Sequence, residues 1–257
     1  MERVLKLDKD IFNLINSVRA DPKSFIPSID AVLKSLDGDV IRREGKTNVR
    51  TNEGAKAVKE AIEYLQKAEK CPALKWSDEL AKAAKEHVDD TGPKGLMQHE
   101  SSKGVSVKER VSQFGKIINC YGENLSFHCD EAIEVLQQLI IDDGVSERGH
   151  RENIFNKDFK AFGCYSGPHK DYDCMTSLIF AGGMVKKGDP DPIEEQMQAY
   201  LKEQVDIEMP TDVRSWKQNT KVHVQGNKAS KTITRVCILK DGSEKTVTKT
   251  LTREFTI

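Results

Sequence analysis

Two runs of sequence, YGENL at residues 121–125 and GHRENIF at residues 149–155, are the most informative part of this chain, with His99 upstream of both. An apolar helical pattern separates the two runs and ends in Asp142 and Asp143. Histidine, glutamate and aspartate are the residue types that bind zinc-like cations or transfer protons near neutral pH. The sequence therefore predicts a polar site here, provided that these separate pieces converge in space.

The composition of the chain argues against two classes of partner. Its 257 residues include 40 Lys and Arg and 41 Asp and Glu, so the formal net charge is −1. That balance gives no whole-protein reason to expect nucleic acid or an anionic membrane as partner. No run approaches the roughly 20 apolar residues of a membrane-spanning helix. The opening MERVLKLDKD also lacks the apolar core of a secretory signal, so we expect an intracellular protein, in the cytoplasm or in a cytoskeletal or ciliary assembly.

Six cysteines occur, and none belongs to a CxxC motif. Without a secretory signal, thiols are favoured over disulfides in a chain of this length. Cys164 and Cys174 lie on or beside two strands that we expect to pair, so a bridge between them is geometrically allowed.

Apolar residues recur at helical spacing in several segments. Asp8 is expected to cap the first helix and Ser77 a later one. Residues 38–52 are polar and irregular, which predicts a loop, and His99 falls in another loop after a helix that stops at Gly92. The expected helices cover residues 9–20, 27–36, 53–67, 78–91, 107–114, 131–143 and 193–205.

Strand patterns follow the helices. Residues 159–166 and 175–181 predict a hairpin around the turn at 167–170, and residues 187–192 are typical of a linker. The tail is rich in Thr and Val, with hairpin turns at Gly226-Asn227 and Asp241-Gly242. Three strands with few large apolar residues do not stand alone, so we expect them to pack on the main domain, another copy or a partner. These strands are predicted at residues 222–225, 231–239 and 245–255.

His99, the two runs quoted above and FGCYSG at residues 162–167 resemble the CAP superfamily of cysteine-rich secretory, antigen 5 and pathogenesis-related proteins, also called the SCP domain. The likeness spans Asp8 to Gly183 in the family's order, and it is nearest to the signal-less forms of single-celled eukaryotes. It implies an α+β fold, an α-β-α sandwich with a small C-terminal β-hairpin or three-stranded appendage. The domains expected are a CAP domain at 1–185, a linker and helix at 186–218, and the β appendage at 219–257.

The resemblance also implies a cleft lined by two histidines and two acids. His99 and His150 match the family's histidines, and Glu123 matches the first acid. For the second acid, Leu139 stands at the usual Trp position and Asp142 at the acid position, where the shorter Asp replaces the family's Glu. Neutral imidazoles would hold zinc or another divalent cation while the acids orient the rings. Alternatively, the four side chains only satisfy one another.

Further residues stand near these four in the sequence. Asp143 or Glu147 could serve as the second acid instead of Asp142, whereas Glu152 and Asn153 are interpreted as structural support. His87, on a helix flank, is more typical of a core-edge histidine than of a ligand. We expect the remaining histidines to be exposed, namely His128, His169 and His223.

Three functions remain open at this level. The first, which we favour, is a non-enzymatic binding module whose cleft holds a divalent cation and a lipid or peptide. The second is a structural or scaffold subunit of a larger intracellular assembly, or a homo-oligomer, docking through residues 219–257. The third is a metal-dependent hydrolase, which needs an open coordination position and a substrate pocket. No nucleophile-elbow, P-loop or dinucleotide motif is present.

Overall fold

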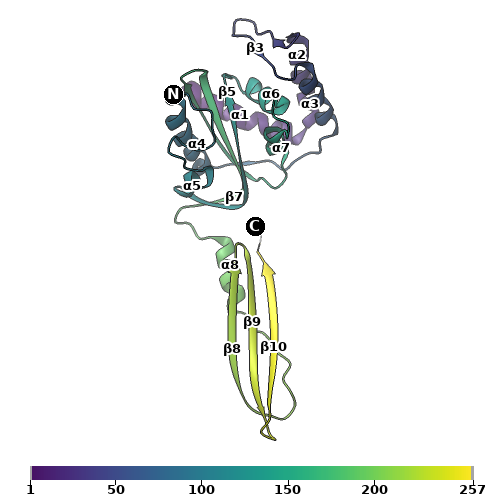
Figure 1. Ribbon diagram of the computed structural model, residues 1–257, viewed down its shortest axis with the longest axis vertical. Helices are drawn as coiled ribbons and strands as arrows, with labels where there is room; N and C mark the ends of the chain where they lie inside the picture. The colour runs from purple at the N-terminus through teal and green to yellow at the C-terminus, as the bar shows by residue number, and fades with distance from the viewer. Residues whose placement is uncertain (1, 256–257) are drawn as a thin grey trace. The chain divides into compact units, whose positions relative to one another are not determined.

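The computed structural model describes residues 2–255, with the side chains of residues 6–255. The chain divides into two compact units, Met1–Gly188 and Asp189–Ile257 (Figure 1). Helices and antiparallel strands alternate without a regular βαβ repeat, which is the expected α+β class. Among the described helices, none is both long and apolar enough to cross a bilayer.

A four-stranded sheet forms the middle layer of the first unit. Its strand order is β4-β6-β7-β5, and only the β4–β6 pair is parallel. Strand β5 therefore lies at one edge of the sheet, a position that matters for the site. The strands are β4 (Lys75–Trp76), β5 (Gly115–Phe127), β6 (Ala161–His169) and β7 (Asp173–Lys186).

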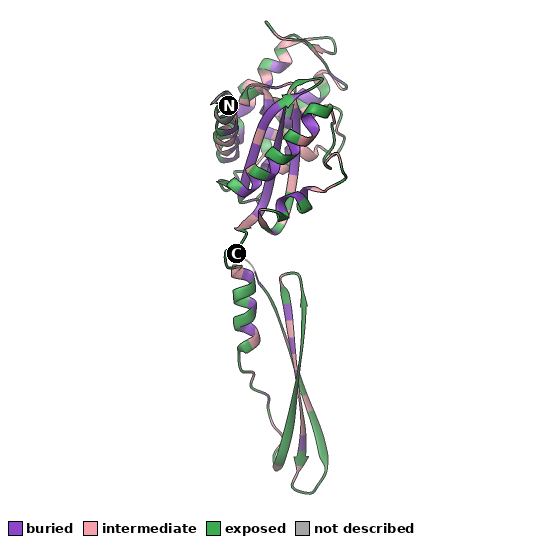
Figure 2. Ribbon diagram, turned by 90° about the vertical axis from the view of Figure 1, so that its left-hand side faces the viewer, coloured by how far each residue is buried: buried purple, intermediate pink, exposed green. Residues whose placement is uncertain are grey.

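Helices cover both faces of this sheet, so the predicted α-β-α sandwich is confirmed (Figures 1 and 2). One core lies between Phe162, Leu178 and Phe180 of the sheet and the first helical layer, and a second lies between Ile179 and the other layer. The first layer contains α1 (Glu2–Ala20), α2 (Ile26–Ser35), α3 (Ala55–Lys67), α6 (Ala132–Ile141) and α7 (Gly149–Phe155). The second contains α4 (Asp78–Thr91), the short 3-10 helix η2 (Gly92–Lys94) and α5 (Val107–Ser112).

The first helix begins earlier than the sequence suggests. Ile11, Ile15 and Val18 are buried at the predicted helical spacing, but α1 already starts at Glu2. Asp8 is therefore not its cap. It lies inside the helix, 4% exposed, with a hydrogen bond to Ser166 of β6.

Three further expectations are corrected by the strands. Residues 38–52 are not a plain loop, because they contribute to a small antiparallel sheet of two-residue strands that are too short to show a sequence period. These strands are β1 (Leu36–Asp37), β2 (Val40–Ile41) and β3 (Val49–Arg50). Strand β6 continues to His169, so the hairpin turn lies after residue 169, and His169 is buried against Phe127 rather than exposed.

The register of the β6–β7 hairpin rules out the bridge that the sequence allowed. Cys164 lies opposite Leu178, whereas Cys174 lies opposite Pro168, four residues away along the strand. No disulfide joins the cysteines that the structure describes. The sulfhydryl of Cys174 instead donates to the carbonyl oxygen of Cys129, 3.0 Å away.

The second unit consists of one helix and a three-stranded antiparallel sheet in the order β10-β9-β8. Asp191 caps the helix by accepting from the backbone N–H groups of Ile193 and Glu194. The first two strands are longer than predicted, and the first begins at residue 213 rather than 222, because its exposed polar residues hide it in the sequence. The elements are α8 (Pro192–Lys202), β8 (Val213–Gln225), β9 (Lys228–Leu239) and β10 (Glu244–Glu254).

Candidate functional site

The first predicted histidine is paired with the first predicted acid. His99 lies in the loop between η2 and α5, and its Nδ1 is 2.9 Å from Oε2 of Glu123 on β5. The Glu123 side chain is 2% exposed, whereas the His99 side chain is 50% exposed. Because Nδ1 is bound to the carboxylate, Nε2 of His99 is the ring nitrogen left for a ligand.

Arg110 and Ser177 hold this carboxylate in place. Arg110 of α5 donates to Oε1 of Glu123 at 2.5 Å and to the backbone carbonyl of His99, and Ser177 donates to the same Oε1 at 2.8 Å. Sequence reasoning missed Arg110. The pattern that could have identified it is an arginine on the apolar face that Val107 and Val111 form on a short helix.

The interactions in this cluster shift the pKa values of Glu123 and His99 in the directions that favour their ionised forms. Burial by itself raises the pKa of Glu123, but the hydrogen bond from His99 and the charge of Arg110 outweigh it, and the net pKa is lowered. The hydrogen bond to Glu123 raises the pKa of His99, against the opposing effect of burial. Glu123 is therefore a fixed negative charge beneath a half-exposed imidazole.

The second histidine forms a matching pair with Asp142. Nδ1 of His150 lies 2.6 Å from Oδ1 of Asp142, while Oδ2 accepts from the backbone N–H groups of His150 and Arg151. Asp142 adopts a left-handed conformation, φ 56°, where α6 ends, and this turn points its side chain at the start of α7. The shorter Asp therefore reaches His150 because the turn brings the backbone close.

Strand β5 connects the two pairs. Consecutive residues of a strand point to opposite faces of its sheet. Glu123 faces α5 and bonds His99, while Nδ2 of Asn124 donates to the backbone carbonyl of His150 at 2.9 Å. The two His–carboxylate pairs thus flank one edge strand at adjacent residues.

Gly122 allows α7 to approach this edge. A Cβ atom added at Gly122 would lie 2.7 Å from Oδ1 of Asn153, closer than real Cβ contacts allow. Nδ2 of Asn153 donates to Oδ1 of Asn124 at 2.8 Å. Asn153 therefore links the helix that carries His150 to strand β5 through a side chain and not, as expected, through backbone groups of its turn.

The other candidate acids are not part of either pair. Both oxygens of Asp143 accept hydrogen bonds from Asn52 and Glu53, ahead of α3. Glu147 and Glu152 are exposed. His87 is completely buried and its Nε2 contacts the carbonyl of Gln98, in agreement with a core histidine.

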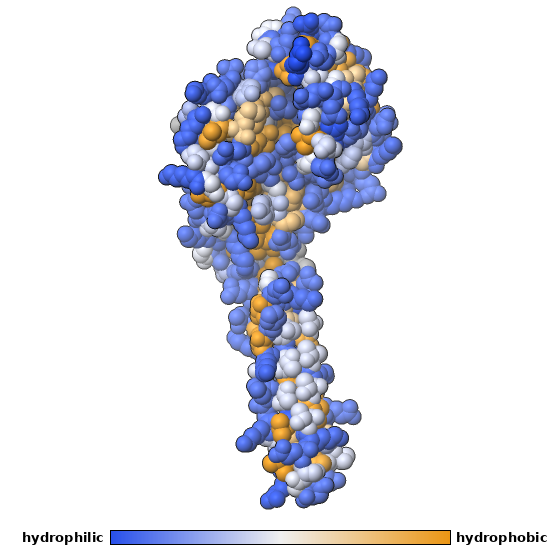
Figure 3. Space-filling view, viewed as in Figure 1, coloured by the Kyte–Doolittle hydropathy of each residue, from blue (hydrophilic) through white to orange (hydrophobic). Residues whose placement is uncertain are grey.

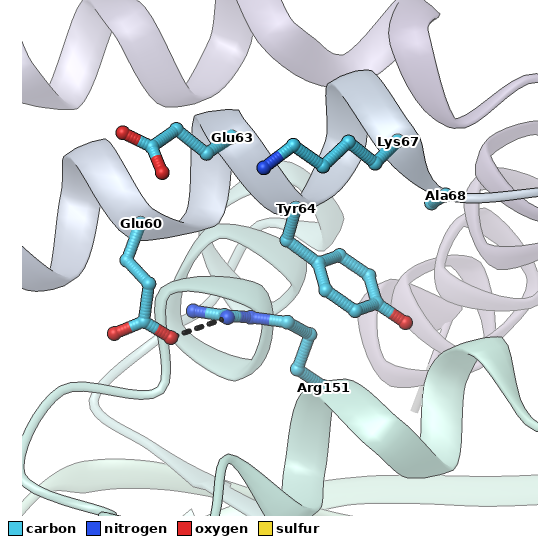
Figure 4. A pocket seen from close by; sticks show the side chains of 6 residues that line it. All are labelled: Glu60, Glu63, Tyr64, Lys67, Ala68 and Arg151. Carbon is cyan, nitrogen blue, oxygen red and sulfur yellow. Dashed lines mark hydrogen bonds and ion pairs between the residues drawn. The ribbon is translucent and has the colours of Figure 1, made fainter.

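A second polar cluster anchors α7 to α3. Arg148, also in a left-handed conformation, donates to Glu53, Glu60 and the carbonyl of Asp142. Arg151 donates to Glu60 and to two carbonyls at the end of α6. An open pocket of about 340 Å³ lies beside it (Figure 4). Its lining residues are Glu60, Glu63, Tyr64, Lys67, Ala68 and Arg151, so neither predicted histidine contributes.

The two His–carboxylate pairs can be compared with the ligand sets that hold divalent cations in proteins. Each imidazole is bound through Nδ1 to a buried carboxylate, the arrangement that orients histidine ligands in metal sites. No group of three or more His, Cys, Asp or Glu side chains within the described part of the chain is placed to hold a metal. The two histidines are therefore oriented like metal ligands, but the described residues form two separate His–carboxylate pairs and not a four-ligand structural zinc site.

Comparison with known structures finds related domains of low similarity. An extracellular protein of Bacillus anthracis that contains an SCP domain is 23% identical, with TM-score 0.35, over 43% of this chain and 34% of that one. An outer surface protein from Borrelia burgdorferi is 22% identical, with TM-score 0.37, over 43% and 78% of the two chains. The CAP domain of enterococcal PrgA is 16% identical, with TM-score 0.34, over 55% and 60%. This chain thus spans about a third of the Bacillus protein.

The family assignment rests on a different comparison, since the structural similarities are weak. No curated protein sequence matches this chain. The family model described as CAP, the cysteine-rich secretory protein family, matches residues 12–180. That span covers well over half of the chain and includes both His–carboxylate pairs. This chain therefore belongs to the CAP family of cysteine-rich secretory proteins.

Proposed function

We propose that the CAP domain of this chain is a non-enzymatic binding module in which His99 and His150 together hold a divalent cation, with zinc as the first candidate. The observation that carries the proposal is the pairing of each ring, through Nδ1, with a buried carboxylate. Such a partner fixes the tautomer and leaves Nε2 of both rings available as ligands. A cation bound there would supply a positive centre for a polar ligand group.

Binding is a better account of the site than catalysis. A metal-dependent hydrolase also needs a substrate pocket beside the metal. The pockets at α3 and at α8 are lined by neither His99 nor His150. The charged lining of the α3 pocket also does not suit the aliphatic chain of a lipid, so a peptide or another polar molecule is the better candidate for a second ligand.

Calorimetric titration of the metal-stripped protein with zinc at neutral pH tests the proposal. The parent protein should show saturable binding, and the double variant His99→Ala, His150→Ala should lose it. A matched control, His128→Ala with His223→Ala, removes two histidines outside the site and should bind like the parent. Equal zinc affinity in the parent and the His99, His150 variant would refute the proposal.

A further inference from the structure

The sheet of the second unit has one long edge strand that the rest of its chain leaves uncovered. Strand β8 pairs only with β9 within the described residues, so its other edge is open. Of its residues Val213–Gln225, all but Val213 are exposed. Open edges of this length ordinarily invite pairing with another strand.

Strands β9 and β10 of the same sheet, in contrast to β8, have one face covered by other parts of the chain. Helix α8 and the segment that follows it pack on β9 and β10, where Lys231 donates to the carbonyls of Leu201 and Glu203. Arg253 pairs with Glu203, and Lys249 donates to the carbonyl of Asp206. The neighbouring Ile207 is 7% exposed. The acidic segment that follows α8 therefore pairs with basic residues of β9 and β10, and it covers their face with the buried Ile207.

On the face of the sheet that carries Lys231, β8 presents apolar side chains to solvent. Val222 lies opposite Lys231 and Val224 opposite Ala229, and Trp216 lies opposite Cys237. Trp216, Val222 and Val224 are 50%, 48% and 47% exposed. Alternate residues share a face, so these three side chains lie along one face of the open edge. We call them the apolar stripe; the polar Gln218 and Thr220 lie within it, between Trp216 and Val222.

The opposite face of β8 carries positive charge without a partner. Lys217 and Lys221 alternate with the apolar stripe, and neither forms an ion pair with any residue that the structure describes, unlike Lys240 with Asp212 or Arg253 with Glu203. The sequence of β8 contains no carboxylate. The rest of this face is rich in Thr, with charged residues only towards the strand ends, at Lys228, Glu244 and Glu254, and it appears as a near-neutral band in Figure 3.

We propose that β8 is a docking edge for an extended segment of another protein in which apolar and acidic side chains alternate. Added as a fourth strand, such a segment places its apolar side chains beside Trp216, Val222 and Val224. Its acidic side chains then lie on the other face beside Lys217 and Lys221. Lysines on an edge strand oppose pairing with uncharged strands, so they select an acidic partner.

A second copy of this chain that pairs through its own β8 offers no carboxylate to the same edge, because β8 contains none. In the antiparallel pairing centred on Asn219, Lys217 of each copy lies opposite the other copy's Lys221. Like charges directly opposite each other in a sheet are destabilising. Charge complementarity therefore favours a different, acidic strand over self-association through β8.

Fluorescence anisotropy with synthetic peptides tests this inference on the full-length protein. The probe is a labelled peptide about nine residues long that alternates Glu with Val or Ile, which spans Trp216 to Val224 when extended. The parent should bind it. A peptide of the same composition with its Glu and its apolar residues in separate blocks, and a poly-glutamate peptide of equal length, should bind at least about tenfold more weakly. Absent binding of the alternating peptide, or equal binding of all three, overturns the proposal.

Variants locate the binding site. Lys217→Glu with Lys221→Glu should weaken binding of the alternating peptide by about tenfold or more, whereas Lys82→Glu with Lys108→Glu makes the same charge change at exposed positions of the first unit and should not. Val222→Thr with Val224→Thr keeps β-branched residues and should weaken binding by removing the apolar stripe. Parent-like affinity in either β8 variant, with the fold checked by circular dichroism, overturns the proposal.

Discussion

Glu123 holds the site together at the scale of single residues. Its buried carboxylate accepts from Arg110, Ser177 and His99, so it is both a structural counter-ion and the group that orients a candidate ligand. Arg110 is 3% exposed in its side chain, and this makes Glu123 the group that compensates a buried positive charge. Substitutions of Glu123 and of His99 should therefore lower the unfolding free energy by different amounts.

Replacing Glu123 by Gln should therefore destabilise the fold strongly. The change leaves the buried Arg110 guanidinium without its counter-ion, which costs about 3–5 kcal/mol of unfolding free energy. His99→Ala removes only the half-exposed partner and should cost less than about 1 kcal/mol. Urea denaturation of both variants measures the difference. A similar small loss in both would contradict the structural role of Glu123.

Asp142→Asn should weaken cation binding more than it changes the fold. The amide places an N–H₂ group where Asp142 now accepts from the His150 ring and from backbone N–H groups. Zinc affinity should fall by about 10–100-fold, with a loss of about 2 kcal/mol in unfolding free energy. Asp143→Asn is the matched control, because Asp143 bonds the segment before α3, and its zinc affinity should equal that of the parent. If zinc affinity falls in Asp143→Asn but not in Asp142→Asn, the acid that supports cation binding is Asp143 and the assignment of Asp142 is wrong.

The site residues that belong to a motif, or that stand at a fixed spacing from one, could be predicted from the sequence, whereas the pairing of the buried Arg110 with Glu123 could not. The GENL and GHRENIF runs and the spacing from Leu139 pointed to Glu123, His150 and Asp142. Arg110 belongs to no motif, and its role depends on the tertiary contact between α5 and β5. Sequence reasoning has no access to that contact.

At the scale of elements, the contact between α1 and β6 contains a buried acid. Burial raises the pKa of Asp8 from its ordinary value of 3.8 to about 7, against the lowering effect of its hydrogen bonds to Ser166. Between those two pH values the folded state holds a proton that the unfolded state has released. The free energy of unfolding should therefore fall as pH rises from about 4 to about 7.

Asp8→Asn removes this pH dependence, since an amide has no proton to release. The variant should match the parent near pH 4 and exceed its unfolding free energy by about 2–4 kcal/mol at pH 8. Chemical denaturation across this pH range measures the effect, and Asp10→Asn, at an exposed position of the same helix, is the control. Parent-like pH dependence in Asp8→Asn would show that another group is responsible.

The elements that the sequence failed to predict share a physical cause. Helices α1, α3, α4 and α6 bury one face, so their apolar spacing predicts them well. Strand β5 does not alternate cleanly, because its register shifts between Ile118 and Tyr121 and Asn119 takes a positive φ. The strands β1–β3 have two residues each and are too short to show a period, and β8 is exposed and mostly polar before Val222, so only its residues 222–225 could be predicted. These strands escape prediction because they are short, irregular or exposed, and not because they pair weakly.

At the scale of the whole molecule, all four residues of the two pairs belong to the first unit. The second unit contributes none of them, and its sheet and α8 have their own buried core around Ile193, Tyr200 and Ile233. Cation binding and strand docking should therefore be separable properties of this chain.

A fragment of residues 1–188 should thus fold and bind zinc with the affinity of the full chain. Circular dichroism and calorimetric titration of the fragment and of the full-length protein provide the comparison. A fragment that folds but fails to bind zinc would place a required ligand within residues 189–257.

X-ray absorption at the zinc edge of the loaded full-length protein tests whether His99 and His150 hold the cation. We predict two imidazole ligands at about 2.0 Å with oxygen completing the shell, and the loss of the imidazole scattering in the His99→Ala, His150→Ala variant. Sulfur scattering at about 2.3 Å, which would indicate cysteine ligands, or an unchanged spectrum in that variant would contradict the account.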